Sequence, residues 1–220
     1  MSRYETGTVI DFVGMNAPIK GSVISEPVTD NIYVYSLAEN TELNPQTFRY
    51  PHVVFIHSGK ILAFDKDHKG VRTTWQAQAG DLTIIPINIP VGCTAIEDGV
   101  YTRFEVIKPE DINASLKPRG VYSCKDLVPY EEGKVNCFDV VRNEALSIKL
   151  LALDRNCTHE EMTDAGKEMI HVIDGSVTLH TDNNDIVIDT GRSFLLAKHH
   201  SATFHTNDSP CRMILTMNSI

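Results

Sequence analysis

The sequence has no block of positive charge, no paired cysteine motif and no glycine-rich phosphate loop. Its 220 residues carry 20 Lys and Arg against 29 Asp and Glu, which gives a formal net charge of −9. Because no cluster of Lys or Arg offsets this excess, we expect no nucleic-acid partner. The five cysteines form no Cys-x-x-Cys pair and one is left over, so neither a zinc knuckle nor a disulfide framework is indicated.

Signals for a membrane and for export are also missing. The chain contains no run of 18 apolar residues, and residues 1–6 have no apolar core of the kind that signal peptides carry. We therefore expect no membrane partner and a cytoplasmic location. The sequence also lacks the Gly-x-Ser-x-Gly turn of the serine hydrolases and gives no support for that chemistry.

The chain consists of short apolar stretches separated by Gly, Pro, Asn and Asp, which is typical of all-β sandwiches and barrels. The polar, proline-bearing segment 108–120 has no strand character. It divides the chain into residues 1–107, which begin with an N-terminal arm, and residues 121–220. A hydrophobic content of 42% suffices for two cores. In the second half we expect strands near residues 121–123, 135–141 and 146–153.

One pattern occurs twice in the chain, at an offset of 116 residues. Residues 52–64 read HVVFIHSGKILAF and residues 168–180 read EMIHVIDGSVTLH. Each stretch reads as two strands broken at a glycine, and the Asp-Gly pair of the second copy predicts a hairpin. Asn40 and Asn156 each stand 19 residues before that glycine. Self-similarity over about a hundred residues indicates a duplicated domain, because solenoid repeats run to about 20–50 residues.

The repeated pattern resembles the two motifs of the cupin superfamily, Gly-x5-His-x-His-x3/4-Glu-x6-Gly and Gly-x5-Pro-x-Gly-x2-His-x3-Asn. The resemblance covers nearly the whole chain and lies in the turn residues and the strands. It implies an all-β chain of two tandem cupin-type jelly-roll β-barrels (double-stranded β-helices), joined by a short linker, with a ligand site inside each barrel. The matching positions are Asn40, Gln46, Phe48, His52, Gly59, Gly80, Pro86, Asn88 and Val91 in the first half and Asn156, Met162, Asp164, Glu168, Gly175, Gly191, Ala197, His199 and Ala202 in the second.

The first half departs from the family at its metal-ligand positions. The usual cupin site resembles three imidazoles and a carboxylate around an Fe, Mn, Ni or Zn ion, ligand types that suit these ions. Here the corresponding residues are Gln46, Phe48, His52 and Val91, two of which are apolar. We therefore expect the first barrel to be free of metal, with Gln46 and His52 lining a polar pocket.

The second half departs from the family as well. Its corresponding residues are Met162, Asp164, Glu168 and Ala202. The two carboxylates could hold a hard ion such as Ca²⁺ or Mg²⁺ weakly through oxygen. A thioether and a methyl group do not suit a tight transition-metal site.

A displaced metal site in the second half is an alternative to this interpretation. It would combine Glu168 with three histidines of the same half, His180, His199 and His205. The other interpretation is that these histidines lie half exposed on loops and strand edges. We favour the second interpretation, because nothing in the sequence makes the histidines converge.

Glu168 has two interpretations of its own. By analogy with the cupin motif it points into the barrel, where an unpaired carboxylate is costly and either finds a partner or takes up a proton. A buried carboxyl group with a raised pKa is a candidate general acid or base. Alternatively, Glu168 bonds to a backbone group or a histidine and only ties the barrel together. His52, at the equivalent position, has the same two interpretations.

The sequence favours a metal-free protein that binds or senses a small molecule and has no DNA-binding module. One alternative is a metal-dependent enzyme of dioxygenase, isomerase or decarboxylase type that uses the second barrel and a divalent ion. Another is a structural role in which only the fold is kept. We expect no cofactor and a monomer or a homodimer, in which the face made by Val53, Phe55, Met169 and Ile173 is buried. The candidate pocket residues are Gln46, His52, Met162, Asp164 and Glu168.

Overall fold

The computed structural model describes residues 3–66, 69–163, 166–181, 184–196 and 200–218, and of residues 162, 163, 167, 200 and 201 only the backbone. In these residues the regular elements are strands, apart from α1 (Phe12–Met15), α2 (Cys124–Leu127) and the 3-10 helix η1 (Pro109–Asp111). The expected all-β class is therefore confirmed. The chain splits into two compact units: unit 1 is Met1–Arg3 with Phe12–Cys124, and unit 2 is Tyr4–Asp11 with Lys125–Ile220.

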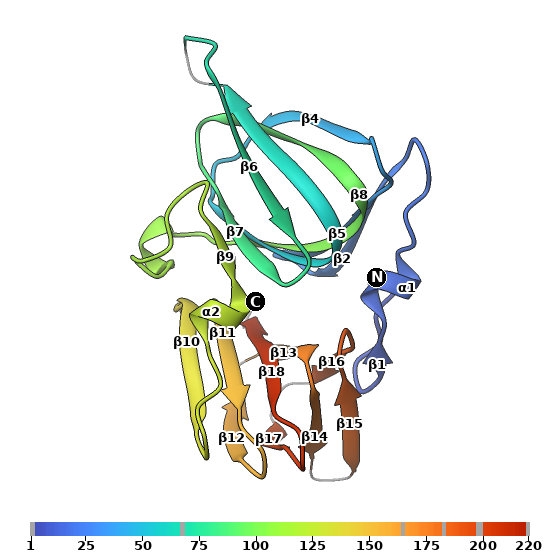
Figure 1. Cartoon of the computed structure of the whole chain (residues 1–220), viewed down its shortest axis with the longest axis vertical. Helices are drawn as coiled ribbons and strands as arrows, with labels where there is room; N and C mark the ends of the chain where they lie inside the picture. Colours follow the sequence, from blue (N-terminus) through green and yellow to red (C-terminus); the bar gives the residue numbers. More distant parts are fainter. Residues whose placement is uncertain (1–2, 67–68, 164–165, 182–183, 197–199, 219–220) are drawn as a thin grey trace. The chain divides into compact units, whose positions relative to one another are not determined.

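Unit 1 is built on one curled sheet with the strand order β2-β3-β8-β5-β7-β9 (Figure 1). Two long strands curl across it: the first part of β5 pairs with β7 and its last part with β6, and β8 pairs first with β4 and then with β3. The strands are β2 (Val23–Thr29), β3 (Ile32–Leu37), β4 (Glu42–Thr47), β5 (His52–Lys66), β6 (Arg72–Gln78), β7 (Asp81–Ile85), β8 (Pro90–Glu105) and β9 (Val121–Ser123).

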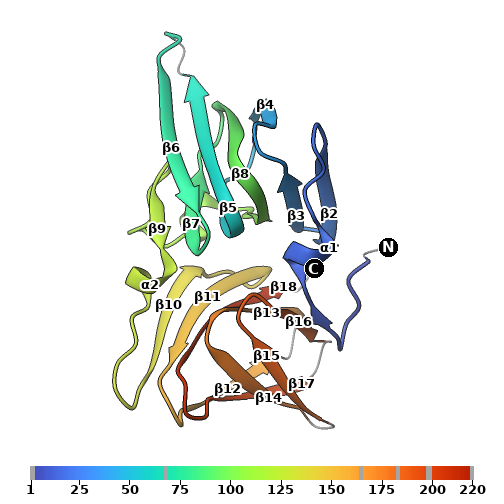
Figure 2. The same cartoon turned by 45° about the vertical axis from the view of Figure 1, so that its right-hand side comes forward.

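Unit 2 consists of two sheets, with the orders β1-β16-β13-β18-β11-β10 and β12-β17-β14-β15. Figure 2 shows the two sheets as separate layers of the unit. The strands are β1 (Val9–Ile10), β10 (Val135–Val141), β11 (Leu146–Leu153), β12 (Thr158–Thr163), β13 (Lys167–Asp174), β14 (Ser176–His180), β15 (Asp185–Asp189), β16 (Ser193–Leu196), β17 (His200–His205) and β18 (Cys211–Asn218). The strands expected near 121–123, 135–141 and 146–153 are thus present as β9, β10 and β11.

The hairpin predicted at the Asp-Gly pair is wrong. β13 pairs with β16 and β18, whereas β14 pairs with β15 and β17, so that Gly175 lies at a corner where the chain passes from one sheet to the other. In unit 1, β5 runs on through the equivalent Gly59. Both glycines have left-handed backbone angles, with φ 73° at Gly59 and 82° at Gly175. The glycine therefore supplies a bend between sheets, which needs the same backbone conformation as a tight turn.

Equivalent positions of the two units make the same backbone contacts. The amide of Gly80 donates to the carbonyl of Ile56 at 2.9 Å, and the amide of Gly191 donates to that of Val172 at 2.8 Å. Asn40 and Asn156, matched by the sequence repeat, both have left-handed φ angles of 63° and 55°. The sequence repeat is thus accompanied by a repeat in backbone geometry.

Two short strands lie in the unit opposite to the one expected. β1 was predicted as an arm of the first half, but it pairs with β16 of unit 2. β9 was predicted to open the second half, but it pairs with β7 of unit 1. The preceding segment, predicted as a linker, bonds to the same edge, since Arg119 N donates to Ile84 O at 2.9 Å. Strands of two or three residues bury too little side chain for their sequence to specify the partner.

Each unit has an apolar interior built from alternate residues of its strands. On β5, Val54 and Ile56 point into the core of unit 1, and on β13, Ile170 and Val172 point into the core of unit 2. On the other face of these strands Val53, Phe55 and Met169 are also buried, and Ile173 is half-buried.

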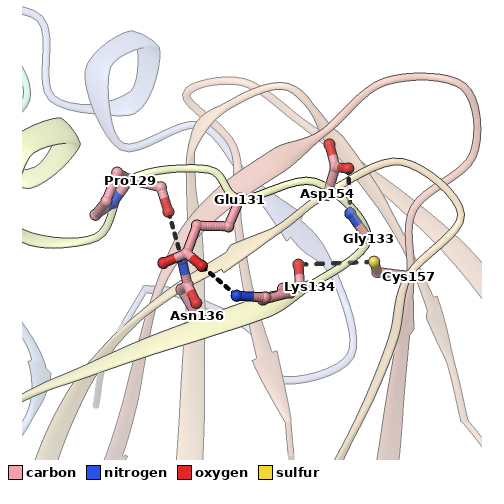
Figure 3. A network of polar contacts seen from close by, with 7 residues as sticks. All are labelled: Pro129, Glu131, Gly133, Lys134, Asn136, Asp154 and Cys157. Atoms are coloured by element: carbon pink, nitrogen blue, oxygen red, sulfur yellow. Dashed lines mark hydrogen bonds and ion pairs between the residues drawn. The ribbon is translucent and has the colours of Figure 1, made fainter.

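The loop that leads into β10 is held by a network of polar contacts (Figure 3). The ammonium of Lys134 lies 2.6 Å from the carboxylate of Glu131, and the amide side chain of Asn136 donates to the same carboxylate at 2.9 Å. The backbone amide of Gly133 donates to Asp154, just after β11, at 2.8 Å. These contacts fix the start of β10 against the end of its neighbour in the sheet.

No helix among the described residues is long and apolar enough to cross a membrane.

Candidate functional site

The interior of unit 1 contains a cavity of about 110 Å³. Strands β3, β4, β5, β7 and β8 supply its walls. Most of the wall is apolar, and the polar side chains that line it include Tyr35, Gln46, His52, Tyr101 and Arg103. Two of the candidate pocket residues, Gln46 and His52, are therefore brought together at this cavity. Gln46 is exposed, whereas His52 is buried.

Strand alternation places the polar groups on the cavity wall. Tyr101 and Arg103 are two residues apart on β8, so both point to the same side of the sheet. Tyr35 lies directly opposite Tyr101 on β3, and the two rings stack with their centroids 5.3 Å apart. The stacked pair forms a flat aromatic wall beside the arginine.

Arg103 is the most unusual group of the cavity, and no motif in the sequence singles it out. Its guanidinium carbon lies 4.6 Å from the ring centroid of Tyr35 and 5.4 Å from that of Phe48. Its Nε is buried and has no hydrogen-bond partner. Among the residues that the structure describes, no carboxylate forms an ion pair with it. The aromatic rings compensate part of the lost solvation of the cation, but leave the N–H unsatisfied.

His52 is buried beside this cation, 2% exposed, with its ring edge-on to Phe48 at 4.4 Å. Burial, and then the positive charge of Arg103, lower the pKa of His52 to about 3. The imidazole is therefore neutral near pH 7, and the 3.6 Å approach of its Nε2 to Glu105 is not an ion pair. Its Nδ1 is buried without a hydrogen-bond partner.

The Cys93 thiol and the Tyr101 hydroxyl at the cavity stay protonated. Burial raises the pKa of the Cys93 thiol to about 11, although its hydrogen bond with Tyr101 acts in the opposite direction. Burial also raises the pKa of the Tyr101 hydroxyl well above its usual value. Neither group is therefore a ready nucleophile or base near pH 7.

The side chains of this cavity do not fit a cupin-type metal ion. Phe48 and Val91, the apolar residues at family ligand positions, both line it. They leave His52 as the only imidazole of the lining, and Arg103 would repel a divalent cation.

In unit 2 the central polar group is Glu168, which is 1% exposed. It lies on the same face of β13 as Ile170 and Val172, which belong to the apolar core. Burial, and then the charge of Glu161, raise the pKa of Glu168 to about 8, while Lys149 acts in the opposite direction. Of the two interpretations of Glu168, the buried carboxyl group with a raised pKa fits this environment better, because one of its carboxylate oxygens is buried without a hydrogen-bond partner.

Sequence reasoning missed the charged groups that act on Glu168, which are Glu161 and Lys149. Glu161 and His159 on β12 lie opposite Ala202 and Phe204, two core residues, so they share the inward face of the sheet. Lys149 Nζ lies 2.9 and 3.0 Å from the two carboxylate oxygens of Glu161, and His159 Nε2 lies 3.0 Å from one of them. The motif spacing had pointed to Met162 and Asp164 instead.

Those residues of the motif lie outside the described part of the chain. They are Asp164 and the side chain of Met162. Of the displaced metal set, His199 lies outside it too. Alternate residues of a strand face the same side, so His159 and Glu161 share one face of β12. Knowing the partner strand would have shown that this face points inward.

The other members of the displaced set do not meet Glu168. Val177 and Leu179 on β14 point into the core, so His180 on the same strand faces outward. His180 lies 2.7 Å from Asp185, and its ring is 6.3 Å from that of His205. The two described histidines are half-buried, which agrees with the interpretation that they do not form a metal site with Glu168. Among the described residues, no three His, Cys, Asp or Glu side chains come together as a metal site would require.

Comparison with known proteins gives matches to structures only. No family model matches the chain, and no curated protein matches it. A cupin 2 conserved barrel domain protein from Leptotrichia buccalis is 16% identical with a TM-score of 0.81, and the match covers 99% of each chain.

Oxalate decarboxylases are similar at a lower level. The Lactobacillus farciminis enzyme in complex with formate is 11% identical with a TM-score of 0.64, and 99% of this chain covers 88% of that one. A structure of the Bacillus subtilis enzyme, described for its Mn(II) centres, is 12% identical with a TM-score of 0.61 and coverage of 98% and 78%. At such low identities the likeness establishes the fold alone, and this chain has the β-barrel fold of the cupin-domain proteins.

Proposed function

We propose that this protein binds a small molecule, without a metal ion, in the cavity of unit 1. The proposal depends on one observation: two residues that line this cavity each have a buried polar atom without a hydrogen-bond partner. These atoms are Nε of Arg103 and Nδ1 of His52. Buried polar groups in proteins nearly always have a hydrogen-bond partner, and an unpaired one costs about 1–3 kcal/mol. A ligand in the cavity would supply the missing partners.

The composition of the wall supports the same proposal. Ligand sites are concave, mostly apolar and contain a few converging polar groups. The cavity combines aliphatic side chains such as Ile61 and Ile85 with the polar residues described above. Its Phe48 and Val91 occupy family ligand positions, which favours binding without metal.

We further infer that the two units are cupin-type barrels derived from one duplicated domain. The shared left-handed positions, Gly59 with Gly175 and Asn40 with Asn156, support this inference. The full-length match to the cupin 2 barrel domain protein is consistent with it. In this view each unit kept the turns of the scaffold and changed the residues at the ligand positions.

The proposal is tested by binding to the full chain in the presence of EDTA. We expect a panel of anionic, neutral and cationic small molecules to contain ligands that raise the melting temperature, since a ligand specific to the native state stabilises it. Ala63→Leu, which fills the cavity, and Gln46→Phe, at an exposed position of its lining, should each weaken this binding at least tenfold. Gln46→Phe keeps the test valid if Ala63→Leu is too destabilised. Binding that neither variant weakens, or no binding at all, would contradict the proposal.

The second candidate function is a metal-dependent enzyme that uses unit 2. It is favoured by Glu168, a buried carboxyl group that titrates near neutral pH next to the Glu161 carboxylate. The similar Bacillus subtilis oxalate decarboxylase is described with Mn(II) centres. Elemental analysis of the purified protein separates the two functions. About one equivalent of a transition metal, lost in Glu168→Gln but kept in Arg103→Gln, would support the enzyme and contradict the metal-free protein.

A further inference from the structure

We infer, on the basis of the proposed function, that the ligand is a small organic monoanion whose carboxylate pairs with Arg103 and whose apolar part fills the cavity of unit 1.

The charge of the cavity wall is the first argument for a ligand with one negative charge. Arg103 is the only formally charged residue that lines the cavity, because no Asp, Glu or Lys belongs to the lining. The imidazole, the thiol and the buried phenol described above are neutral near pH 7. One positive charge is therefore left without a counter-ion, and a single carboxylate would balance it. A dianion would leave one negative charge buried, and a cation would be repelled.

Nearby carboxylates do not already neutralise Arg103. Glu105 approaches His52, and Glu42 lies close enough to influence Cys93. Neither carboxylate lines the cavity, and neither forms an ion pair with Arg103. No described residue of unit 1 therefore supplies a counter-charge to this arginine.

The aromatic rings around the Arg103 guanidinium are the second argument, and they favour a carboxylate. Tyr35 and Phe48 contact it through their rings, which restricts its orientation while leaving N–H groups at its edge. Nε, at that edge, is unpaired. A planar fork of this kind matches a carboxylate with two parallel hydrogen bonds. A neutral amide could offer only one acceptor atom and would not balance the charge.

The volume of the cavity and its apolar inner wall are the third argument, and they limit the size of the ligand. An engineered cavity of about 150 Å³ lined by Leu, Ile and Phe binds benzene. The present cavity of about 110 Å³ is somewhat smaller, and Val54, Ile61 and Ala63 make its inner wall apolar. The apolar part of the ligand is therefore no larger than a benzene ring, which limits the class to short aliphatic and small aromatic carboxylic acids.

The test compares matched pairs of probes on the full chain, with EDTA and at constant ionic strength. The probes are propionate, isobutyrate and benzoate, their three amides, the dianion malonate and the cation isobutylamine, measured by titration calorimetry. We expect at least one monocarboxylate to bind at least tenfold more tightly than its amide, and malonate and isobutylamine to bind more weakly. Arg103→Gln should remove the preference for the carboxylate, and Arg155→Gln, an exposed site in unit 2, should keep it. Arg103→Lys should keep part of it.

The outcomes separate this inference from the proposed function. If amides or amines bind as well as carboxylates, and Ala63→Leu abolishes that binding, the carboxylate is wrong while the cavity is still the site. If carboxylates bind but Ala63→Leu and Gln46→Phe have no effect, the site lies elsewhere and both are wrong. Arg103→Gln is checked for folding by circular dichroism. If it does not fold, the preference for carboxylates over amides is measured on the unchanged chain and on Arg103→Lys, and it tests the carboxylate in the same way.

Discussion

Gly59 and Asp98 are in direct backbone contact at the corner of β5. A Cβ added to Gly59 would lie 2.7 Å from the carbonyl carbon of Asp98, and the residue has a left-handed φ of 73°. In unit 2 a Cβ on Gly175 would lie 3.0 Å from the carbonyl carbon of Pro210. Each corner therefore needs glycine for two reasons, the backbone conformation and the close approach of a second strand.

The Gly59→Ala substitution should destabilise the chain strongly because it meets both constraints. We expect the free energy of unfolding to fall by more than about 2 kcal/mol, of which the left-handed conformation alone accounts for about 1–2 kcal/mol. Gly80→Ala is the matched control, since its φ is 86° but an added Cβ meets nothing within 4 Å. Urea denaturation measures both variants. Equal losses would show that the contact with Asp98 has no effect of its own.

These corners explain how much of the fold was predictable from the sequence. Left-handed positions accept few residue types, so Gly59 and Gly175, like Asn40 and Asn156, can be recognised at matching spacings in the sequence. The consequence of that spacing was less predictable. A bend between two sheets and a hairpin turn need the same backbone angle, so only the strand partners distinguish them.

The candidate site was predicted in part. Motif spacing pointed to His52 and Glu168, and both are buried inside their units. Arg103 was missed because it lies on β8, far along the chain from the motif residues, and an arginine on a strand is usually exposed. Only the pairing of β8 with β3 and β5 brings it to the cavity wall.

Removing the charge from Asp174 should leave Arg212 buried without a counter-ion. The Arg212 guanidinium is paired with Asp174, donates from Nε to Val128 O at 3.0 Å, and lies over the ring of Tyr130. Asp174→Ala should lower the free energy of unfolding by about 3 kcal/mol, because breaking a buried pair costs more than the pair contributes. The Asp174 side chain is 30% exposed, which keeps the loss at the lower end of the range.

Tyr130→Phe is the control for this prediction. It keeps the ring over Arg212 and removes only the hydroxyl that donates to Asp174. A loss of about 1 kcal/mol is expected for one hydrogen bond. Thermal or urea unfolding of both variants gives the comparison, and a similar loss in the two would show that the ion pair is not the larger contribution.

Glu168 should make the protein more stable as the pH falls from 8 toward 4.5. Its pKa in the folded chain is raised to about 8, so the folded state binds a proton in this range that the unfolded state releases. The free energy of unfolding should therefore decrease with rising pH, by at most about 1.4 kcal/mol per pH unit from this group. Glu168→Gln should flatten the dependence between pH 6.5 and 8. An unchanged slope in that variant would contradict the assignment.

His171 should act on stability in the opposite direction. It is 3% exposed and lies 2.8 Å from Ser193 Oγ, and burial lowers its pKa to about 3 from an ordinary value of 6.5. Its contribution is present above pH 6.5 and is lost as the pH falls through 3, because the unfolded chain takes up the proton first.

Glu168 and His171 both lie on β13, so the unfolding of unit 2 reports on both groups. Their effects on the free energy of unfolding can be separated by pH range. Of these two groups only Glu168 changes the free energy of unfolding above pH 6.5, the two effects oppose each other between 6.5 and 4.5, and below 4.5 only His171 continues to change it. His171→Asn should therefore reduce the loss of stability in acid and leave the slope above pH 6.5 unchanged, whereas Glu168→Gln should do the reverse. Urea denaturation from pH 3.5 to 8.5, followed by the NMR signals of unit 2, measures both. A variant that changes both ranges equally would show that the two residues titrate as one coupled pair.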